Sequence, residues 1–95
     1  MTADTQHLPL TKDEKIGRVI AAVLDLTGMQ QAYLAALIGM KPSTLSNKIN
    51  GLRPWKSSEV ERVAQALGVP EPMLGRDPAA ILEELRRQFV NYRSA

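Results

Sequence analysis

Two short stretches with the apolar spacing of helices, separated by only three residues, constrain this chain more than any other feature. The stretches cover about residues 30–38 and 42–50 and are linked by Gly39-Met40-Lys41. In each, large apolar residues recur three or four positions apart, which is the spacing of a buried helix face. The positions expected to face inward are Leu34, Leu37, Ile38, Leu45 and Ile49. A link this short brings the two helices into direct contact.

The residues around this link suit a tight turn between two helices that cross steeply. Gly39 can take a positive φ angle without steric cost, and Pro42 fits the first helical turn, where its missing N–H costs nothing. Ala35 is small enough to lie where the helices meet, and Gly51 ends the second helix. Together these features predict a helix-turn-helix motif.

The rest of the chain predicts a compact, all-α bundle of about five helices. A first helix over about residues 12–27 begins at a capping box, in which Thr11 and Glu14 satisfy each other's backbone N–H groups. No segment shows the two-residue alternation of a β-strand beyond chance.

Helices are also predicted after the motif. A second capping box at residues 58–61 starts a helix that ends at Gly68, and a short helical piece at Met73-Leu74 closes the core. Asp77-Pro78 is a strong start for a last helix over about residues 78–92, with Glu83 and Arg87 expected to pair along its surface. The chain is thus divided into a polar, flexible tail (1–10), a helix-turn-helix domain (11–76) and a C-terminal helix (77–95).

Composition excludes several classes of protein. The 95 residues correspond to one domain with no cysteine and a single histidine, His7, in the polar tail. Without cysteine, a glycine-rich phosphate loop or a carboxylate pair in a plausible cleft, we expect no enzyme, no metal, no cofactor and no small-molecule substrate. No apolar run approaches the roughly 18 residues of a membrane span, and the first residues lack the order of a signal peptide. We therefore expect a cytoplasmic protein with no membrane partner.

The distribution of charge indicates a polyanionic partner. No acidic residue lies between Asp25 and Glu59, although the net charge of the whole chain is only +2. The cations of this acid-free stretch are Lys41, Lys48, Arg53 and Lys56. A neutral-to-basic segment flanked by mixed charges is typical of a surface that meets nucleic acid.

The outer face of the helix at 42–50 carries short polar side chains and one cation. Such side chains near the start of a recognition helix reach base edges in the major groove of double-stranded DNA. The residues expected to contact bases are Ser43, Thr44, Asn47 and Lys48. Lys41, Arg53 and Lys56 are placed for the phosphate backbone, as are Gln30 and Gln31, where the preceding helix offers free N–H groups.

Residues 29–69 closely resemble the Cro and phage-repressor (XRE-like) helix-turn-helix family. The matching features are Gln31 before Leu34-Ala35, Gly39, Ser43-Thr44-Leu45-Ser46, Asn50-Gly51, and the Ala-Gln-Ala-Leu-Gly-Val ending of the fourth helix. The resemblance implies a lambda-repressor-like bundle that binds operator DNA, usually as a dimer on a palindrome.

The resemblance also implies roles for single residues. It gives Gln31 a backbone contact that braces a base contact, Ser43 and Asn47 base contacts, and Asn50 a backbone contact. Arg53 and Lys56 lie in the loop that commonly touches phosphates.

Two positions depart from the family pattern, and a third, Trp55, allows two interpretations. Pro42 stands where the family often has a base-contacting glutamine, so the base preference stays open. Lys48 stands where many members bury an apolar residue, and Ile49 takes over that packing. Trp55 is interpreted as a cover over the core rather than as a residue that stacks on a base.

The last helix has an apolar seam with spacing three, four and three, formed by Leu82, Leu85, Phe89 and Tyr92. The seam either folds back onto its own core or pairs with the same seam of a second chain, and we favour a homodimer because pairing stabilises a small domain. The predicted function is a transcriptional regulator, a repressor of phage or prophage Cro type. The alternative is an antitoxin or a protein-interaction adaptor that uses the last helix to bind a partner.

Overall fold

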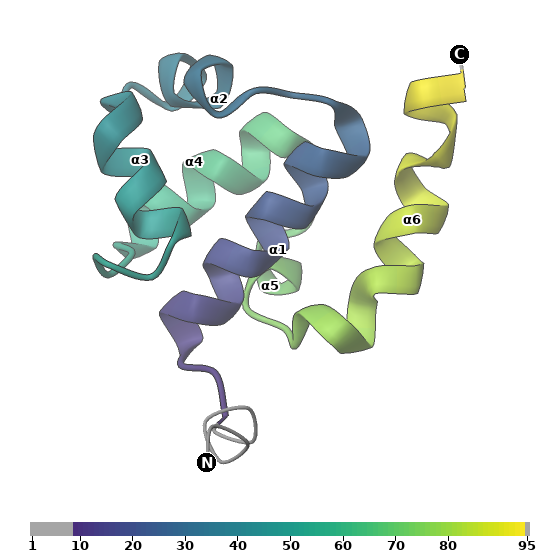
Figure 1. Cartoon of the computed structure of the whole chain (residues 1–95), viewed down its shortest axis with the longest axis horizontal. Helices are drawn as coiled ribbons and strands as arrows, with labels where there is room; N and C mark the ends of the chain where they lie inside the picture. Colours follow the sequence, from purple (N-terminus) through teal and green to yellow (C-terminus); the bar gives the residue numbers. More distant parts are fainter. Residues whose placement is uncertain (1–8, 95) are drawn as a thin grey trace, which may run out of the picture.

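The computed structural model describes residues 9–94 of the chain, with side chains described as far as Phe89. In this part the chain is all-helical, which confirms the predicted fold class (Figure 1). Its six helices are α1 (Lys12–Thr27), α2 (Gln31–Ile38), α3 (Pro42–Ile49), α4 (Ser57–Leu67), α5 (Glu71–Leu74) and α6 (Pro78–Ser94). The helix beyond the five expected is the single-turn α5, which is the short helical piece predicted at Met73-Leu74. Residues 1–8, and with them His7, lie outside the described part.

The start of α1 forms the predicted capping box. The backbone N–H of Glu14 donates to Thr11 Oγ1 at 3.1 Å, and that of Thr11 donates to Glu14 Oε1 at 2.8 Å. The helix ends at Gly28, whose φ angle of 76° is in the left-handed region that glycine tolerates. Local chemistry therefore fixes both ends of this helix.

The predicted start of α4 was wrong. The helix begins at Ser57 rather than after Ser58, and the carboxylate that accepts a backbone N–H is that of Glu59, which receives the N–H of Lys56 at 2.9 Å. Glu59 takes this role because it is the third residue of the helix and its carboxylate is already held in the interior by Lys48. Glu61 is exposed.

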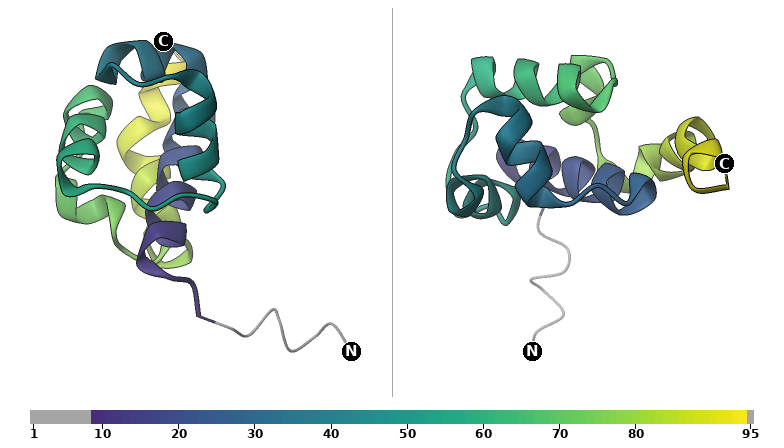
Figure 2. Two further views of the ribbon diagram at one scale, coloured as in Figure 1. Left: turned by 90° about the vertical axis from the view of Figure 1, so that its left-hand side faces the viewer. Right: turned by 90° about the horizontal axis from the view of Figure 1, so that it is seen from above.

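The core is organised around α1, which contacts α3, α5 and α6, while α2 packs on α3 and α4. Figure 1 and the right-hand view of Figure 2 show that α6 lies on the side of α1 away from α3. All six helices contribute fully buried large side chains: Val19, Ile20, Val23, Leu34, Leu45, Val63, Leu74, Ile81 and Leu85. One continuous core therefore supports both the helix-turn-helix segment and the C-terminal helix.

Leu37 corrects the predicted inward face of α2, because half of this side chain (50%) is exposed. The buried residues of α2 are Leu34, Ala35 and Ile38. At about 100° per residue, these three side chains lie within an arc of about 100° that begins at Leu34. Leu37 lies outside this arc, about 60° from Leu34 in the opposite direction around the helix. Apolar character alone does not identify the buried face here, since every residue of α2 after Gln31 is apolar.

Gly17 lies at the closest approach of α1 to α3. It is buried, and a Cβ atom built on it would overlap the backbone oxygen of Ile49 and lie 3.0 Å from the carbonyl carbon. The sequence analysis did not single out this glycine. The missing side chain allows the end of α3 to rest directly on the backbone of α1.

The C-terminal helix begins as predicted, with Asp77 Oδ1 accepting the backbone N–H of Ala79 at 3.1 Å. Leu85 and Phe89, expected to pair with a second chain, are buried in the chain's own core beside Ile81. Because Ile81 lies on the same side of α6, that side turns toward α1 rather than outward.

Other predictions for α6 have different outcomes. Leu82 is half-buried, and the side chain of Tyr92 lies outside the described residues. Glu83 pairs with Arg86 at 3.3 Å rather than with Arg87, through an i, i+3 contact on the exposed surface.

No single helix of the described residues is long and apolar enough to cross a membrane. Only α1 and α2 taken together reach the required length and composition, and they are bent by 114° at their junction.

Candidate nucleic-acid interface

The turn between α2 and α3 has the geometry of the predicted motif. Gly39 adopts a φ angle of 69°, and its N–H donates to Ala36 O at 3.3 Å. The next N–H, that of Met40, donates to Ala35 O at 2.9 Å, and the Ala35 side chain is fully buried. These two bonds close the end of α2 so that α3 can begin at Pro42.

Arg62 of α4 completes this turn from outside the motif. Its Nη1 donates to the carbonyl oxygen of Ile38 at 2.8 Å, which satisfies a carbonyl that the end of α2 leaves without a helical partner. Sequence reasoning missed this contact because the two residues are 24 positions apart and Arg62 follows no capping pattern. A cation at this end also complements the α2 dipole.

The outer face of α3 carries the predicted base-contacting residues, apart from Lys48. Ser43 is exposed, and Thr44, Ser46 and Asn47 are half-buried, whereas Leu45 and Ile49 are turned into the core. None of the residues of α3 is acidic. The helix therefore presents hydroxyl and amide groups outward, with its apolar side firmly packed.

The predicted backbone-contacting residues surround this face. Gln30 and Gln31 lie at the start of α2, where no side chain caps the helix, and Gln30 is exposed. Asn50 follows α3 and donates weakly to Ser46 Oγ at 3.5 Å. The predicted backbone-contacting cations Lys41, Arg53 and Lys56 are all exposed.

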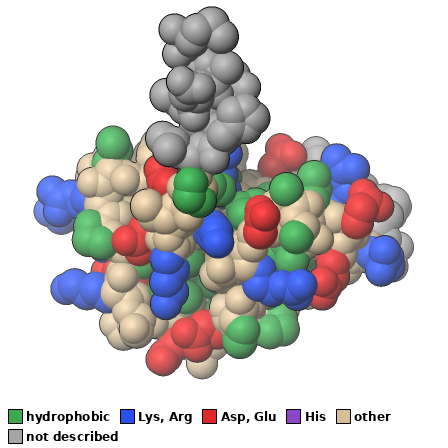
Figure 3. All heavy atoms as spheres, turned by 90° about the horizontal axis from the view of Figure 1, so that it is seen from below, with side chains coloured by type: hydrophobic (Ala, Val, Ile, Leu, Met, Phe, Trp, Pro, Cys, Tyr) green, Lys and Arg blue, Asp and Glu red, His purple; other side chains and the backbone are tan. Residues whose placement is uncertain are grey.

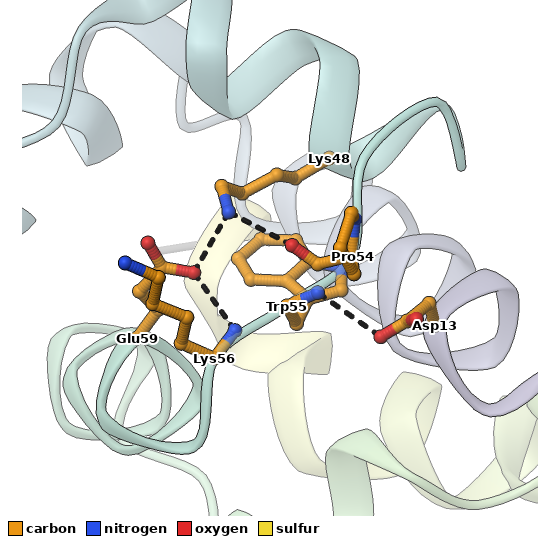
Figure 4. A network of polar contacts seen from close by, with 6 residues as sticks. All are labelled: Asp13, Lys48, Pro54, Trp55, Lys56 and Glu59. Atoms are coloured by element: carbon orange, nitrogen blue, oxygen red, sulfur yellow. Dashed lines mark hydrogen bonds and ion pairs between the residues drawn. The ribbon is translucent and has the colours of Figure 1, made fainter.

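Lys48 does not share the outer face of α3 with the other residues predicted to contact bases. Only 8% of its side chain is exposed, and its Nζ donates to Glu59 Oε1 at 2.9 Å and to the carbonyl oxygen of Pro54 at 2.8 Å (Figure 4). Both of these acceptors point inward between α3, α4 and the loop that joins them. Lys48 is thus held among interior contacts, unlike the exposed side chain of Ser43.

The same network lowers the pKa of Glu59. Burial raises the pKa of this carboxyl, but the backbone N–H of Lys56 and the ammonium group of Lys48 outweigh it, so the pKa lies below its ordinary value. Glu59 is thus an ionised, buried carboxylate near neutral pH, with a cation against it.

This lowered pKa predicts a loss of stability in acid. Because the pKa of Glu59 is lower in the folded state, its contribution is complete above the ordinary value of 4.5 and is lost as the pH falls through the folded pKa. Urea unfolding of the wild type and of Glu59→Gln between about pH 7 and pH 3 should show two stabilities that converge toward acid. A constant difference between them would contradict the lowered pKa.

The position of Trp55 confirms the prediction that this residue covers the core. It is partly buried against the hydrophobic core, and its backbone N–H donates to Asp13 Oδ1 at 3.0 Å (Figure 4). The bond ties the loop between α3 and α4 to the first turn of α1.

Charged side chains of both signs are mixed on the surface, so charge alone does not identify a binding surface. On the face shown in Figure 3, Lys and Arg side chains alternate with Asp and Glu, and no large patch of one sign is visible. The candidate interface is therefore identified by the acid-free outer face of α3 and the few cations around it.

Comparison with protein families gives a match to this chain. The model of a family described as helix-turn-helix matches residues 20–74, which is more than half of the chain and runs from within α1 to the end of α5. The matched segment contains the whole of α2, α3 and α4. Neither the curated proteins nor the solved structures give a match.

Proposed function

Because this chain belongs to the helix-turn-helix family of DNA-binding regulators, we propose that it is a transcriptional repressor of Cro or phage-repressor type. The repressor acts by inserting α3 into the major groove of an operator and so occluding a promoter. The observation that supports this proposal most strongly is the outer face of α3, which is polar and free of acids while its opposite face is buried.

The residues divide into two roles in this proposal. Ser43, Thr44 and Asn47 contact base edges, since hydroxyl and amide groups at these positions can donate and accept in the major groove. A second set positions the protein by contacts to phosphates and carries no sequence information. This set consists of Gln30, Gln31, Lys41, Asn50, Arg53 and Lys56.

The proposed regulator binds a palindromic operator as a homodimer. Two copies double the contacts to DNA, and their symmetry is matched by two half-sites about one helical turn apart. Because Leu85 and Phe89 are buried within each copy, the contact between the two copies uses residues other than these two. Selection of bound sites from random duplexes tests the proposal directly: a palindromic motif supports it, and the absence of any enriched motif rejects it.

Asn47→Ala should relax the sequence preference at one base position and cost about 1–3 kcal/mol of specific binding. The amide group of this half-buried residue can form paired bonds with one base, most suitably adenine, and alanine cannot. Competition binding against operator variants with single base changes measures the effect. The matched control is Gln88→Ala, which removes an exposed amide from α6, a helix on the far side of α1 from α3 (Figure 1). An unchanged preference in Asn47→Ala would remove this residue from the base-contacting set.

Arg53→Ala should weaken binding about equally to all sequences and lower the slope of log affinity against log salt by about one. Arg53 is exposed in the loop after α3, where a guanidinium can neutralise a phosphate. Titrations at several salt concentrations measure the slope, and Arg87→Ala, which removes an exposed cation of α6, serves as the control. A loss confined to operator DNA would contradict the phosphate role.

A further inference from the structure

The loop between α3 and α4 carries two cations proposed for phosphate contact but has few backbone bonds of its own. Its first half is held to α3, because Gly51 N donates to Lys48 O at 3.2 Å and Leu52 N donates to Asn47 O at 2.8 Å. Among the described residues, no bond between backbone groups then holds Arg53, Pro54 or Trp55. The position of the second half must therefore come from other contacts.

Side chains from three helices provide these contacts at three successive residues. Lys48 of α3 donates to Pro54 O at 2.8 Å, Asp13 of α1 accepts from Trp55 N at 3.0 Å, and Glu59 of α4 accepts from Lys56 N at 2.9 Å (Figure 4). Lys48 and Glu59 also pair with each other at 2.9 Å, with 8% and 11% of their side chains exposed. One buried ion pair thus joins the recognition helix, the loop and the start of α4.

The same loop carries two exposed cations. Arg53 and Lys56 are exposed, while the backbone on either side of Trp55 is fixed from inside. The place of both cations relative to α3 therefore depends on the inner bonds to the loop backbone.

We propose that Lys48 and Glu59 are positioning residues for DNA binding, which hold the phosphate-contacting loop at a set distance from the base-contacting face of α3. The inference rests on the proposed function. It adds the requirement that the loop contacts phosphates while the outer face of α3 contacts bases. Lys48 acts without touching DNA. It fixes the loop backbone at Pro54 directly and at Lys56 through Glu59, and so sets the positions of Arg53 and Lys56.

The test uses the double variant Lys48→Met/Glu59→Gln in the full chain. Methionine fills the space of the lysine stem without a charge, and glutamine keeps an acceptor for Lys56 N, so α4 retains its start while Pro54 O loses its donor. We expect the base preference of the wild type, an affinity lower by roughly 10-fold for all duplexes, and a salt slope lower by one to two. Adding Arg53→Ala should then cost much less than it does in the wild type.

A second readout does not depend on DNA. Trp55 is the single tryptophan of the chain and lies within the loop, so quenching of its fluorescence by acrylamide reports loop mobility directly. We expect acrylamide to quench the fluorescence more strongly in the double variant than in the wild type, while the two proteins have the same melting temperature. Should this variant fail to fold, Lys48→Met/Glu59→Met replaces it.

The outcomes separate the two levels of the argument. A wild-type protein that ignores duplex DNA at low salt rejects the proposed function, and increased quenching in the double variant would still support the fixed loop. A wild type that binds DNA, with a double variant of equal affinity, equal salt slope and equal quenching, overturns the positioning role.

Discussion

Gly17→Ala is expected to destabilise the fold by about 2–4 kcal/mol, although alanine is the better helix former. The added Cβ would overlap the backbone oxygen of Ile49, and backbone atoms cannot move aside as a flexible side chain can. Either α1 and α3 separate or the end of α3 is distorted. Urea unfolding at neutral pH measures the change.

Ala21→Gly provides the matched control for this substitution. Ala21 is exposed on the same helix, about one turn further along, and makes no comparable approach to α3. Its replacement should cost only the ordinary difference in helix propensity, about 1 kcal/mol. If Gly17→Ala raised the stability by a similar amount instead, the direct contact of the α1 and α3 backbones would be disproved.

Lys48→Met is expected to lower the free energy of unfolding by about 3–5 kcal/mol, since it leaves the carboxylate of Glu59 buried without its cation. Removing one partner of a buried pair exposes the full cost of desolvating the other. Thermal and urea unfolding of Lys48→Met, Glu59→Gln and the double variant form a complete cycle.

The double variant should regain most of the stability that Lys48→Met loses, because no unpaired charge remains in the interior. A coupling energy of well over 1 kcal/mol between the two positions would follow from the 2.9 Å contact. If the two single substitutions simply added, the pair would have to be treated as an exposed contact of little energetic value.

Local residue chemistry explains why most helix ends were predictable. Thr11, Glu14 and Asp77 form the expected caps, and Gly28 and Gly39 take the positive φ angles that end helices. These features depend on residues a few positions apart, so they can be recognised before the tertiary structure is known.

The features that sequence analysis missed depend on contacts between distant residues. Charge patterning predicts Lys48 to be a DNA-facing cation because it does not show that Glu59, eleven positions later, faces Lys48 across the loop. The sequence likewise gives no sign that Gly17 meets Ile49, since a glycine inside a helix has no local signature of close packing. Leu37 shows the same limit for α2, where apolar residues on all sides leave the buried face undetermined.

The packing of α6 against α1 means that the hydrophobic core extends beyond the segment shared with the family. Residues 20–74 omit the first half of α1, including Ile16 and Val19, and all of α6, including Ile81 and Leu85. A chain trimmed to these limits would leave the remaining apolar side of α1 in contact with water. The motif that meets DNA therefore relies on flanking sequence at both ends for its own cohesion, and any transfer of this motif to another protein has to carry those flanks with it.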